Sequence, residues 1–322
     1  MVELKGRADE IPNQSMLVNA ITLQEAKDSS EIENIVTTQD TLYKAFSSNI
    51  SSTDAQTKEV LRYRQALWER YNDLNKRPLS INSFIEIVQT IKENGSGIRN
   101  APGTTITSNN KMIYTPPEGE DEIRNLLKNL EDFIHTEDDI DYLIKLAIMH
   151  YQFEAIHPFF DGNGRTGRLI NMLYIVEKGL LGIPILYLSK YIIENKNDYF
   201  TNLRNVTEKS AWETWILFML KGIEETAQYT LDKINAINIL MQETISFSKE
   251  NLLTRVYSKE LIELLSEQPY CKVKYLVDKD IAKRQTAAEY LNELERIGIL
   301  KSQKVGVEKL YLNVKLVEVL NK

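Results

Sequence analysis

Apolar residues recur every three or four positions along most of the chain, and this spacing predicts a mainly helical protein. The clearest helix is residues 139–156, which Pro158 ends and whose apolar side chains share one face: Ile140, Leu143, Ile144, Ala147, Ile148 and Tyr151. A second helix fits 165–178, with Gly179 as its C-terminal cap. The same spacing predicts further helices at 56–75, 81–93, 120–135, 195–205 and 211–245.

Residues 99–117 break the helical pattern because they are rich in turn formers and β-branched side chains. Two short β-forming runs, 104–107 and 112–115, flank the polar residues 108–110, and this arrangement predicts a β-hairpin. The acidic run at 118–122 then begins a helix, whose N-terminal end is stabilised by negative charge. We therefore interpret the acidic run as structural.

The C-terminal part, 251–322, has a different pattern and charge. It holds 13 Lys/Arg and 10 Asp/Glu, a net charge of +3, whereas the whole chain carries -7. Its predicted elements follow the order of a winged helix-turn-helix: helices 258–266, 272–277 and 280–296, then strands 300–305 and 308–312 around Gly306. Lys283 and Arg284 begin the helix that would meet DNA. Because glutamates follow them and the net charge is small, DNA binding is an alternative that we do not favour over dimerisation or target docking.

Length and composition exclude several protein classes. At 322 residues the chain suggests about two domains. Its 43% apolar and 26% charged residues exclude a mainly disordered chain, and its single cysteine, Cys271, excludes a disulfide scaffold. The first residues lack the apolar stretch of a signal peptide, and the longest apolar runs are too short to cross a bilayer. We therefore expect a soluble cytoplasmic protein with no membrane partner.

The segment 157–168, HPFFDGNGRTGR, concentrates residues suited to phosphate chemistry between two predicted helices. Gly162 and Gly164 lie where a helix begins, so backbone N–H groups and the positive helix end can converge on an anion. Arg165 and Arg168 are three residues apart, share one helix face, and suit a polyphosphate.

Two further residues of this segment extend the hypothesis to catalysis. Asp161 supplies a carboxylate, and Mg²⁺ commonly binds one or two carboxylates together with phosphate oxygens. A neutral His157 could take a proton from an attacking hydroxyl. The combination indicates a nucleotide-dependent transferase. The spacing fits neither an EF-hand calcium loop nor the P-loop of nucleoside triphosphatases.

At every defining position this segment resembles the signature of the Fic family, H-x-F-x-[DE]-G-N-G-R-x-x-R, and the resemblance extends over roughly 1–230. It implies a mainly α fold: a Fic-type helical bundle with a β-hairpin flap, joined here to a small C-terminal winged helix-turn-helix domain. We expect an N-terminal helical segment with an inhibitory helix at 1–75, a catalytic core at 76–250 and the winged helix at 251–322. The implied activity is protein adenylylation, in which AMP passes from ATP to a Ser, Thr or Tyr hydroxyl with the help of Mg²⁺.

The resemblance also implies individual roles. His157 would be the general base and Asp161 the Mg²⁺ ligand. Phosphate would contact Gly162, Asn163, Gly164, Arg165, Thr166, Gly167 and Arg168, the last of which would hold the γ-phosphate. Tyr199 and Phe200 would line the adenine pocket, unless they belong to the core. The flap residues Thr105, Ile106, Ile113 and Tyr114 would clamp a target segment by strand addition.

Ser29, Glu33 and Asn34 resemble the inhibitory pattern of the family, [ST]-x-x-x-E-[GN]. Glu33 would pair with Arg168 and so compete with the γ-phosphate, which implies self-inhibition within one chain. The target protein, which could be the chain itself, and a homodimer stay open. Two alternatives remain: a DNA-binding regulator, and a related Fic transferase that moves UMP, phosphate or phosphocholine or removes AMP.

Overall fold

The computed structural model describes residues 1–9, 14–47, 53–101, 106–108 and 111–321, which are mostly helical, as predicted. Its helices are α1 (Val2–Asp9), α2 (Gln14–Ile32), α3 (Gln39–Ser47), α4 (Ala55–Asp73), α5 (Ile81–Lys92), α6 (Glu120–His135), α7 (Tyr142–Ile156), α8 (Asn163–Glu177), α9 (Leu188–Glu194), α10 (Lys196–Lys209), α11 (Trp212–Asn251), α12 (Lys259–Ser266), α13 (Val273–Asp278), α14 (Arg284–Arg296) and α15 (Val314–Asn321). Its strands are β1 (Ile106–Ser108), β2 (Lys111–Tyr114), β3 (Tyr270–Cys271), β4 (Leu300–Val305) and β5 (Glu308–Asn313).

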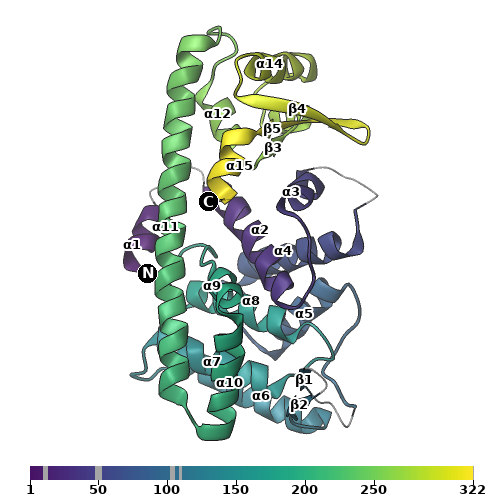
Figure 1. Cartoon of the computed structure of the whole chain (residues 1–322), viewed down its shortest axis with the longest axis vertical. Coiled ribbons are helices and arrows are strands. Elements are labelled where there is room, and N and C mark those ends of the chain that lie inside the picture. The colour runs from purple at the N-terminus through teal and green to yellow at the C-terminus, as the bar shows by residue number, and fades with distance from the viewer. Residues whose placement is uncertain (10–13, 48–52, 102–105, 109–110, 322) are drawn as a thin grey trace.

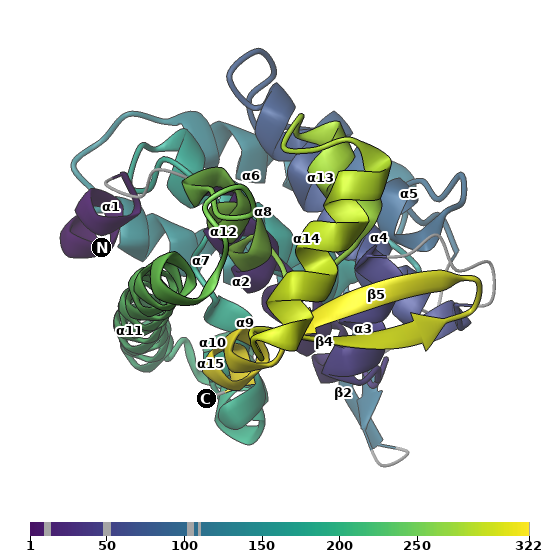
Figure 2. The same cartoon turned by 90° about the horizontal axis from the view of Figure 1, so that it is seen from above.

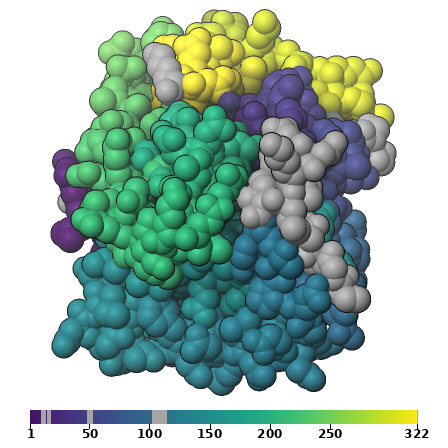
Figure 3. Space-filling view, turned by 60° about the horizontal axis from the view of Figure 1, so that its bottom comes forward, coloured from purple at the N-terminus to yellow at the C-terminus, as the bar shows by residue number. Residues whose placement is uncertain are grey.

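Helix α8 is the centre of the bundle, and α2, α4, α5 and α7 pack around it (Figure 1). Twelve of its fifteen residues are buried, including the polar ones of its first turns. The long helix α11 runs beside the bundle and reaches the C-terminal elements at the other end of the molecule (Figure 1). The space-filling view shows the blue and teal residues around α6 and α7 as a continuous lower face beneath the green α10 (Figure 3).

Several helix boundaries differ from the sequence prediction, and the spacing did not predict α1, α3, α9 or most of α2. Helix α7 starts at Tyr142 and not at 139, because the Asp141 side chain caps it by accepting the Leu143 N–H at 2.8 Å. Helix α8 starts two residues early, at Asn163, and α11 extends to Asn251. Helix α2 was anticipated only at its end, because its buried face carries polar side chains that hide the apolar spacing: Thr22, Gln24, Glu25, Ser29 and Ser30.

The predicted hairpin is present as the antiparallel pair β1–β2, with Ile106 opposite Tyr114. Of the predicted flap residues, Thr105 lies outside the described residues, while Ile106, Ile113 and Tyr114 lie in the two strands. The Tyr114 hydroxyl donates to the Ala155 carbonyl oxygen at 2.9 Å, which joins β2 to α7. The hairpin is thus attached directly beside the end of α7, where the motif begins.

The C-terminal elements follow the predicted order, with two additions, β3 and α15. The three strands form an antiparallel sheet in the order β3-β5-β4. This unit lies against α2 and α3, as both views show (Figures 1 and 2). The Tyr270 hydroxyl donates to Asp40 of α3 at 2.5 Å, and Gln24 of α2 donates to the Leu320 carbonyl oxygen at 2.5 Å.

No helix in the described part of the chain is both long enough and apolar enough to cross a bilayer.

Removing residues 251–322 is expected to destabilise the remaining chain. Tyr270, Leu310, Leu316 and Leu320 are buried in the same hydrophobic cluster as the helical bundle. Burying such a side chain is worth about 1.5–3 kcal/mol, so their loss should lower the free energy of unfolding by roughly 5 kcal/mol or more. The unfolding midpoints of 1–250 and of the full chain, compared by calorimetry, test this. Equal midpoints would mean that the two parts fold independently.

Candidate functional site

The loop between α7 and α8 holds the motif residues in a fixed shape. His157 ends α7 in a left-handed conformation (φ 48°), and Gly162 precedes α8 with φ 84°, a conformation that glycine adopts without strain. The Asn163 side chain accepts the Phe159 N–H at 2.8 Å and donates to the Phe159 carbonyl oxygen at 2.7 Å. Phe159 is fully buried and packs the loop against the core. The side-chain amide of Asn163 therefore holds the loop in shape. Only the backbone N–H of Asn163 is left to contact a phosphate.

His157 is partly buried beside the first residues of the loop. Arg99 fixes this turn, because its Nε donates to the His157 carbonyl oxygen at 2.7 Å and its backbone N–H donates to that of Pro158 at 2.9 Å. The imidazole Nδ1 is buried and has no hydrogen-bond partner among the described residues. Burial and the nearby positive charge of Arg99 lower the pKa of His157 to about 4. At neutral pH the imidazole is therefore uncharged and able to accept a proton.

Asp161 belongs to a group of four alternating charges. Its carboxylate is 2.5 Å from Lys92 Nζ and 3.6 Å from Arg165 Nη2, and its side chain is 64% exposed. Glu59 of α4 accepts from both cations, from Lys92 Nζ at 2.7 Å and from Arg165 Nη1 at 2.5 Å. Burial alone would raise the pKa of Asp161, but hydrogen bonding to Lys92 and the two positive charges hold it below its usual value. Asp161 is therefore an ionised carboxylate that faces solvent.

Arg165 and Arg168 point from the first turns of α8 in different directions. Arg165 is fully buried, and its Nε and Nη2 atoms have no hydrogen-bond partner among the described residues. Arg168 is also buried, and its guanidinium reaches α2 and the residue after it: Nε donates to Ser29 Oγ at 2.9 Å, and Nη2 donates to the Ser29 carbonyl oxygen at 2.7 Å and to Glu33 Oε1 at 2.9 Å. Burial works against its charge, yet the neighbouring carboxylates keep the pKa of Arg168 above its usual value.

Glu33 lies directly over the N-terminal turn of α8. A Cβ atom added to Gly164 would be 2.2 Å from Glu33 Oε1 and 3.0 Å from Arg168 Nη1, so only glycine leaves room for this contact. The first N–H groups of a helix have no partner inside the helix, and they attract anions. The Glu33 carboxylate thus occupies the position where the sequence predicts an anion-binding site.

Asn34 explains how the chain turns just after Glu33, the residue that follows the end of α2 at Ile32. It has φ 63°, a left-handed conformation that asparagine and glycine adopt most readily. The Ile32 carbonyl oxygen at this end accepts from Lys196 Nζ at 2.6 Å. One turn above Ser29, the fully buried Glu25 accepts the Ser189 N–H at 3.0 Å and the Tyr63 hydroxyl at 3.1 Å. Bonds at Glu25 and at Ile32 therefore hold α2, the helix that directly precedes Glu33, in place.

The profile described as the Fic/DOC family N-terminal region matches residues 1–72, and the profile of the Fic/DOC family itself matches 78–175. Together these two matches span more than half of the chain. The chain belongs to the Fic/DOC family. A third profile, described as the C-terminal domain of SoFic-like protein adenylyltransferases, matches residues 225–316.

Individual Fic relatives cover different parts of the chain. A protein of Aquifex aeolicus named "Probable protein adenylyltransferase" is 41% identical over 70 residues, 22% of each chain. The protein adenylyltransferase fic-1 of Caenorhabditis elegans is 26% identical over 166 residues, 50% of this chain and 31% of that protein. The matches thus span less than a third of these curated relatives. A crystal structure of a Fic family protein from Desulfovibrio desulfuricans has the same fold, with a TM-score of 0.57 and 19% identity over 97% of this chain and 93% of that one.

The predicted adenine-pocket residues of this Fic protein have separate environments. Tyr199 is buried, and its hydroxyl is 2.8 Å from Nε2 of His150, which is buried as well. Its neighbour Phe200 is 45% exposed, so only this ring presents a surface to a ligand. Thr166 is fully buried, and Gly167 leaves the space that Glu154 fills, because an added Cβ would be 2.6 Å from Glu154 Oε1. Both residues pack α8 against its neighbours.

Four residues that sequence reasoning did not assign complete the Fic site: Glu59, Lys92, Arg99 and Glu154. The first three lie 58 to 106 positions from the motif residues that they contact. Glu154 lies on α7, where its carboxylate is packed against Gly167. Burial raises the pKa of its carboxyl to about 7. No local pattern in the sequence marks the other three, since charged residues at helical spacing are typical of any solvated helix face.

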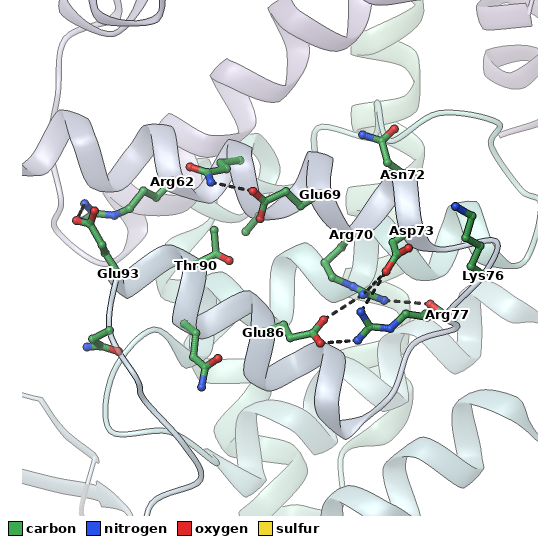
Figure 4. Close-up of a pocket in the computed structure, with 14 residues that line it drawn as sticks. Arg62, Glu69, Arg70, Asn72, Asp73, Lys76, Arg77, Glu86, Thr90 and Glu93 are labelled. Atoms are coloured by element: carbon green, nitrogen blue, oxygen red, sulfur yellow. Dashed lines mark hydrogen bonds and ion pairs between the residues drawn. The ribbon is translucent and has the colours of Figure 1, made fainter. Parts of the chain in front are cut away.

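A separate polar groove of about 980 Å³ lies between α4 and α5 (Figure 4). None of the twelve motif residues is among its described lining residues. Its arginines already pair with carboxylates, as Arg70 and Arg77 do with Asp73 and Glu86. We therefore assign the chemistry to the motif loop.

Proposed function

We propose that this protein is an adenylyltransferase that moves AMP from ATP to a hydroxyl group of a protein, and that Glu33 inhibits it. One observation carries the proposal: the Glu33 carboxylate lies over Gly164 and on Arg168, at the anion-attracting end of α8. A site that attracts one anion in the resting chain is suited to a phosphate in the working one. His157 and Asp161 lie in the same loop, and the family matches support the same class of reaction.

The residues of the loop are suited to Mg²⁺ that is bound together with the phosphates of a nucleotide. Among the described residues, no group of three His, Cys, Asp or Glu side chains could bind a metal alone. Asp161 instead offers one ionised, exposed carboxylate, the number that Mg²⁺ commonly uses beside phosphate oxygens and water. The buried Arg165 Nε and Nη2, which make no hydrogen bond among the described residues, are suited to the same phosphates. When bound there, Mg²⁺ would neutralise charge on the phosphates.

His157 would then act on the target hydroxyl. As the hydroxyl oxygen forms a bond to the α-phosphorus, the bond from that phosphorus to the bridging β-oxygen breaks and pyrophosphate leaves. The hydroxyl proton passes to the neutral His157 imidazole. Arg168, once free of Glu33, would hold the γ-phosphate and orient the leaving group in line with attack. Tyr114 and the hairpin strands lie beside this loop and could position the target segment.

Two labelled forms of ATP test the reaction class. The Glu33→Gly variant is incubated with a cell lysate and with ATP labelled at either the α- or the γ-phosphate. Transfer of AMP labels protein only from the α-position, and transfer of phosphate labels it only from the γ-position. Kinases of the lysate label protein from the γ-position on their own, so both labels are measured above the same lysate without the variant. We expect added label from the α-position alone. Added label from the γ-position, or from neither position, would contradict the proposal.

The lowered pKa of His157 predicts an unusual pH dependence. A base with its pKa near 4 stays neutral until the pH falls to about 4, so kcat/KM should change little between pH 8 and pH 5.5. A histidine with an ordinary pKa near 6.5 would be half protonated at pH 6.5 and roughly nine-tenths protonated at pH 5.5, so most of the activity would be lost over the same range. The measurement is the pH–rate profile of the Glu33→Gly variant. A half-maximal point near pH 6.5 would show that His157 is not held in its neutral form.

A further inference from the structure

Lys92 lies between two carboxylates that come from different parts of the fold. Its Nζ is 2.5 Å from Asp161 Oδ2 in the motif loop and 2.7 Å from Glu59 Oε1 on α4. Its side chain is only 20% exposed, and that of Glu59 is 17% exposed, whereas Asp161 is open to solvent on its other side. The ammonium group therefore covers the inner side of the one carboxylate that the motif offers to a metal.

The four charges of this group balance one another. Glu59 and Asp161 carry one negative charge each, and Lys92 and Arg165 carry one positive charge each. A divalent cation that binds Asp161 adds positive charge within a few ångströms of the Lys92 ammonium, and the two cations repel. Lys92 must then move away from Asp161 or weaken the binding of the metal.

Glu59 can keep the Lys92 ammonium paired after it leaves Asp161. It already accepts a hydrogen bond from Lys92 and a second one from the buried Arg165, which holds its carboxylate in position. Lys92 can leave Asp161 and keep its bond to Glu59 by a rotation near the end of its side chain. The ammonium then remains paired and is not left as an isolated buried charge, which would be costly.

We propose that Lys92 is a positioning residue that holds the Asp161 carboxylate in the metal-free protein and passes to Glu59 when the metal–nucleotide complex binds. Lys92 and Glu59 together would set the metal concentration at which the nucleotide is loaded. This inference rests on the proposed function in one respect, the role of Asp161 as metal ligand. It concerns residues outside the motif and a property, metal affinity, that can be measured without turnover.

Metal binding is measured directly with Mn²⁺, whose free form is detected by electron paramagnetic resonance, in the presence of a non-hydrolysable ATP analogue. All variants carry Glu33→Gly in the full chain, so that the nucleotide site is open. Lys92→Met removes the competing cation and should tighten Mn²⁺ binding roughly 10-fold, the scale of one unit charge close to the ion. Glu59→Gln should weaken it, because Lys92 then remains on Asp161. The matched control is Lys58→Met, which removes an exposed lysine next to Glu59 on the same helix.

The double variant separates direct from indirect effects. If Glu59 acts through Lys92, Glu59→Gln should change Mn²⁺ affinity several-fold less in the Lys92→Met background than alone. Equal effects in both backgrounds would overturn the proposal. Weaker binding in Lys92→Met, or no difference from Lys58→Met, would overturn it too; the former would indicate that Lys92 contacts phosphate.

Asp161→Ala distinguishes a failure of the role proposed for Lys92 from a failure of the proposed function. If it weakens Mn²⁺ binding and Lys92→Met has no effect, only the role of Lys92 is wrong. If Asp161→Ala itself leaves Mn²⁺ affinity unchanged, the metal is held elsewhere and the proposed function fails at its metal site together with this inference.

Discussion

Replacing Glu33 with glycine is expected to raise the rate of AMP incorporation into protein by roughly 10- to 100-fold. Glu33 Oε1 accepts from Arg168 Nη2 at 2.9 Å, and hydrogen bonds to charged groups are worth about 1.5–3 kcal/mol. Each ~1.4 kcal/mol changes a rate tenfold. Because the carboxylate is part of the same chain, its effective concentration at Arg168 is high and a free nucleotide does not displace it easily.

Two control variants distinguish an Arg168 that is freed from Glu33 from an Arg168 that is removed. Arg168→Ala removes the partner of Glu33 but also the group that would hold the γ-phosphate, so it should not activate. Ser29→Ala removes one bond from Arg168 to an uncharged hydroxyl and leaves Glu33 in place, so it should activate less than Glu33→Gly. The measurement is labelled AMP incorporated per minute. Equal rates in the wild-type chain and Glu33→Gly would refute the inhibitory role of this glutamate.

Replacing His157 with alanine in the Glu33→Gly background is expected to lower the transfer rate by about 10²–10⁴-fold, the usual contribution of a general base. Affinity for the nucleotide should stay nearly unchanged, because the imidazole acts on the target hydroxyl and not on the phosphates. Single-turnover rates and nucleotide binding by calorimetry measure the two quantities separately.

Loss of folding would imitate this result, so the thermal midpoint of the variant is needed as well. The Arg99 bonds reach the backbone of residues 157 and 158 and not the imidazole, so the alanine variant should keep the loop. A folded variant that still transfers AMP at the parent rate would show that another group takes the proton.

The parts of the site that could be predicted are those whose chemistry is local in sequence. The loop 157–168 places a base, a carboxylate, two glycines and two arginines within twelve residues, and the structure keeps them at one helix end. The pattern around Glu33 was readable for the same reason. Its contact with Arg168, 135 residues away, followed from the family resemblance and is present in the structure.

The missed features depend on tertiary packing. Glu59 and Lys92 lie on α4 and α5 as ordinary charged residues, and only the packing of these helices against α8 brings them to Arg165 and Asp161. Most of helix α2 was not predicted because polar side chains interrupt the apolar ones on its buried face, and bonds to buried groups help to fix it. Asn163 was assigned to phosphate, but spacing cannot reveal that its amide is used by Phe159.

The space above Gly164 has a consequence for how this chain can change in evolution. The tethered carboxylate fills it in the resting protein, and a phosphate would have to fill it in the working one, so one missing methyl group serves two opposed states. A lineage that discards Glu33 gains no freedom at position 164, since its substrate still needs the room. A lineage that keeps Glu33 but acquires a side chain at 164 would lose its restraint and its activity in a single step. Selection for inhibition by Glu33 and selection for catalysis therefore both act against a Cβ atom at position 164.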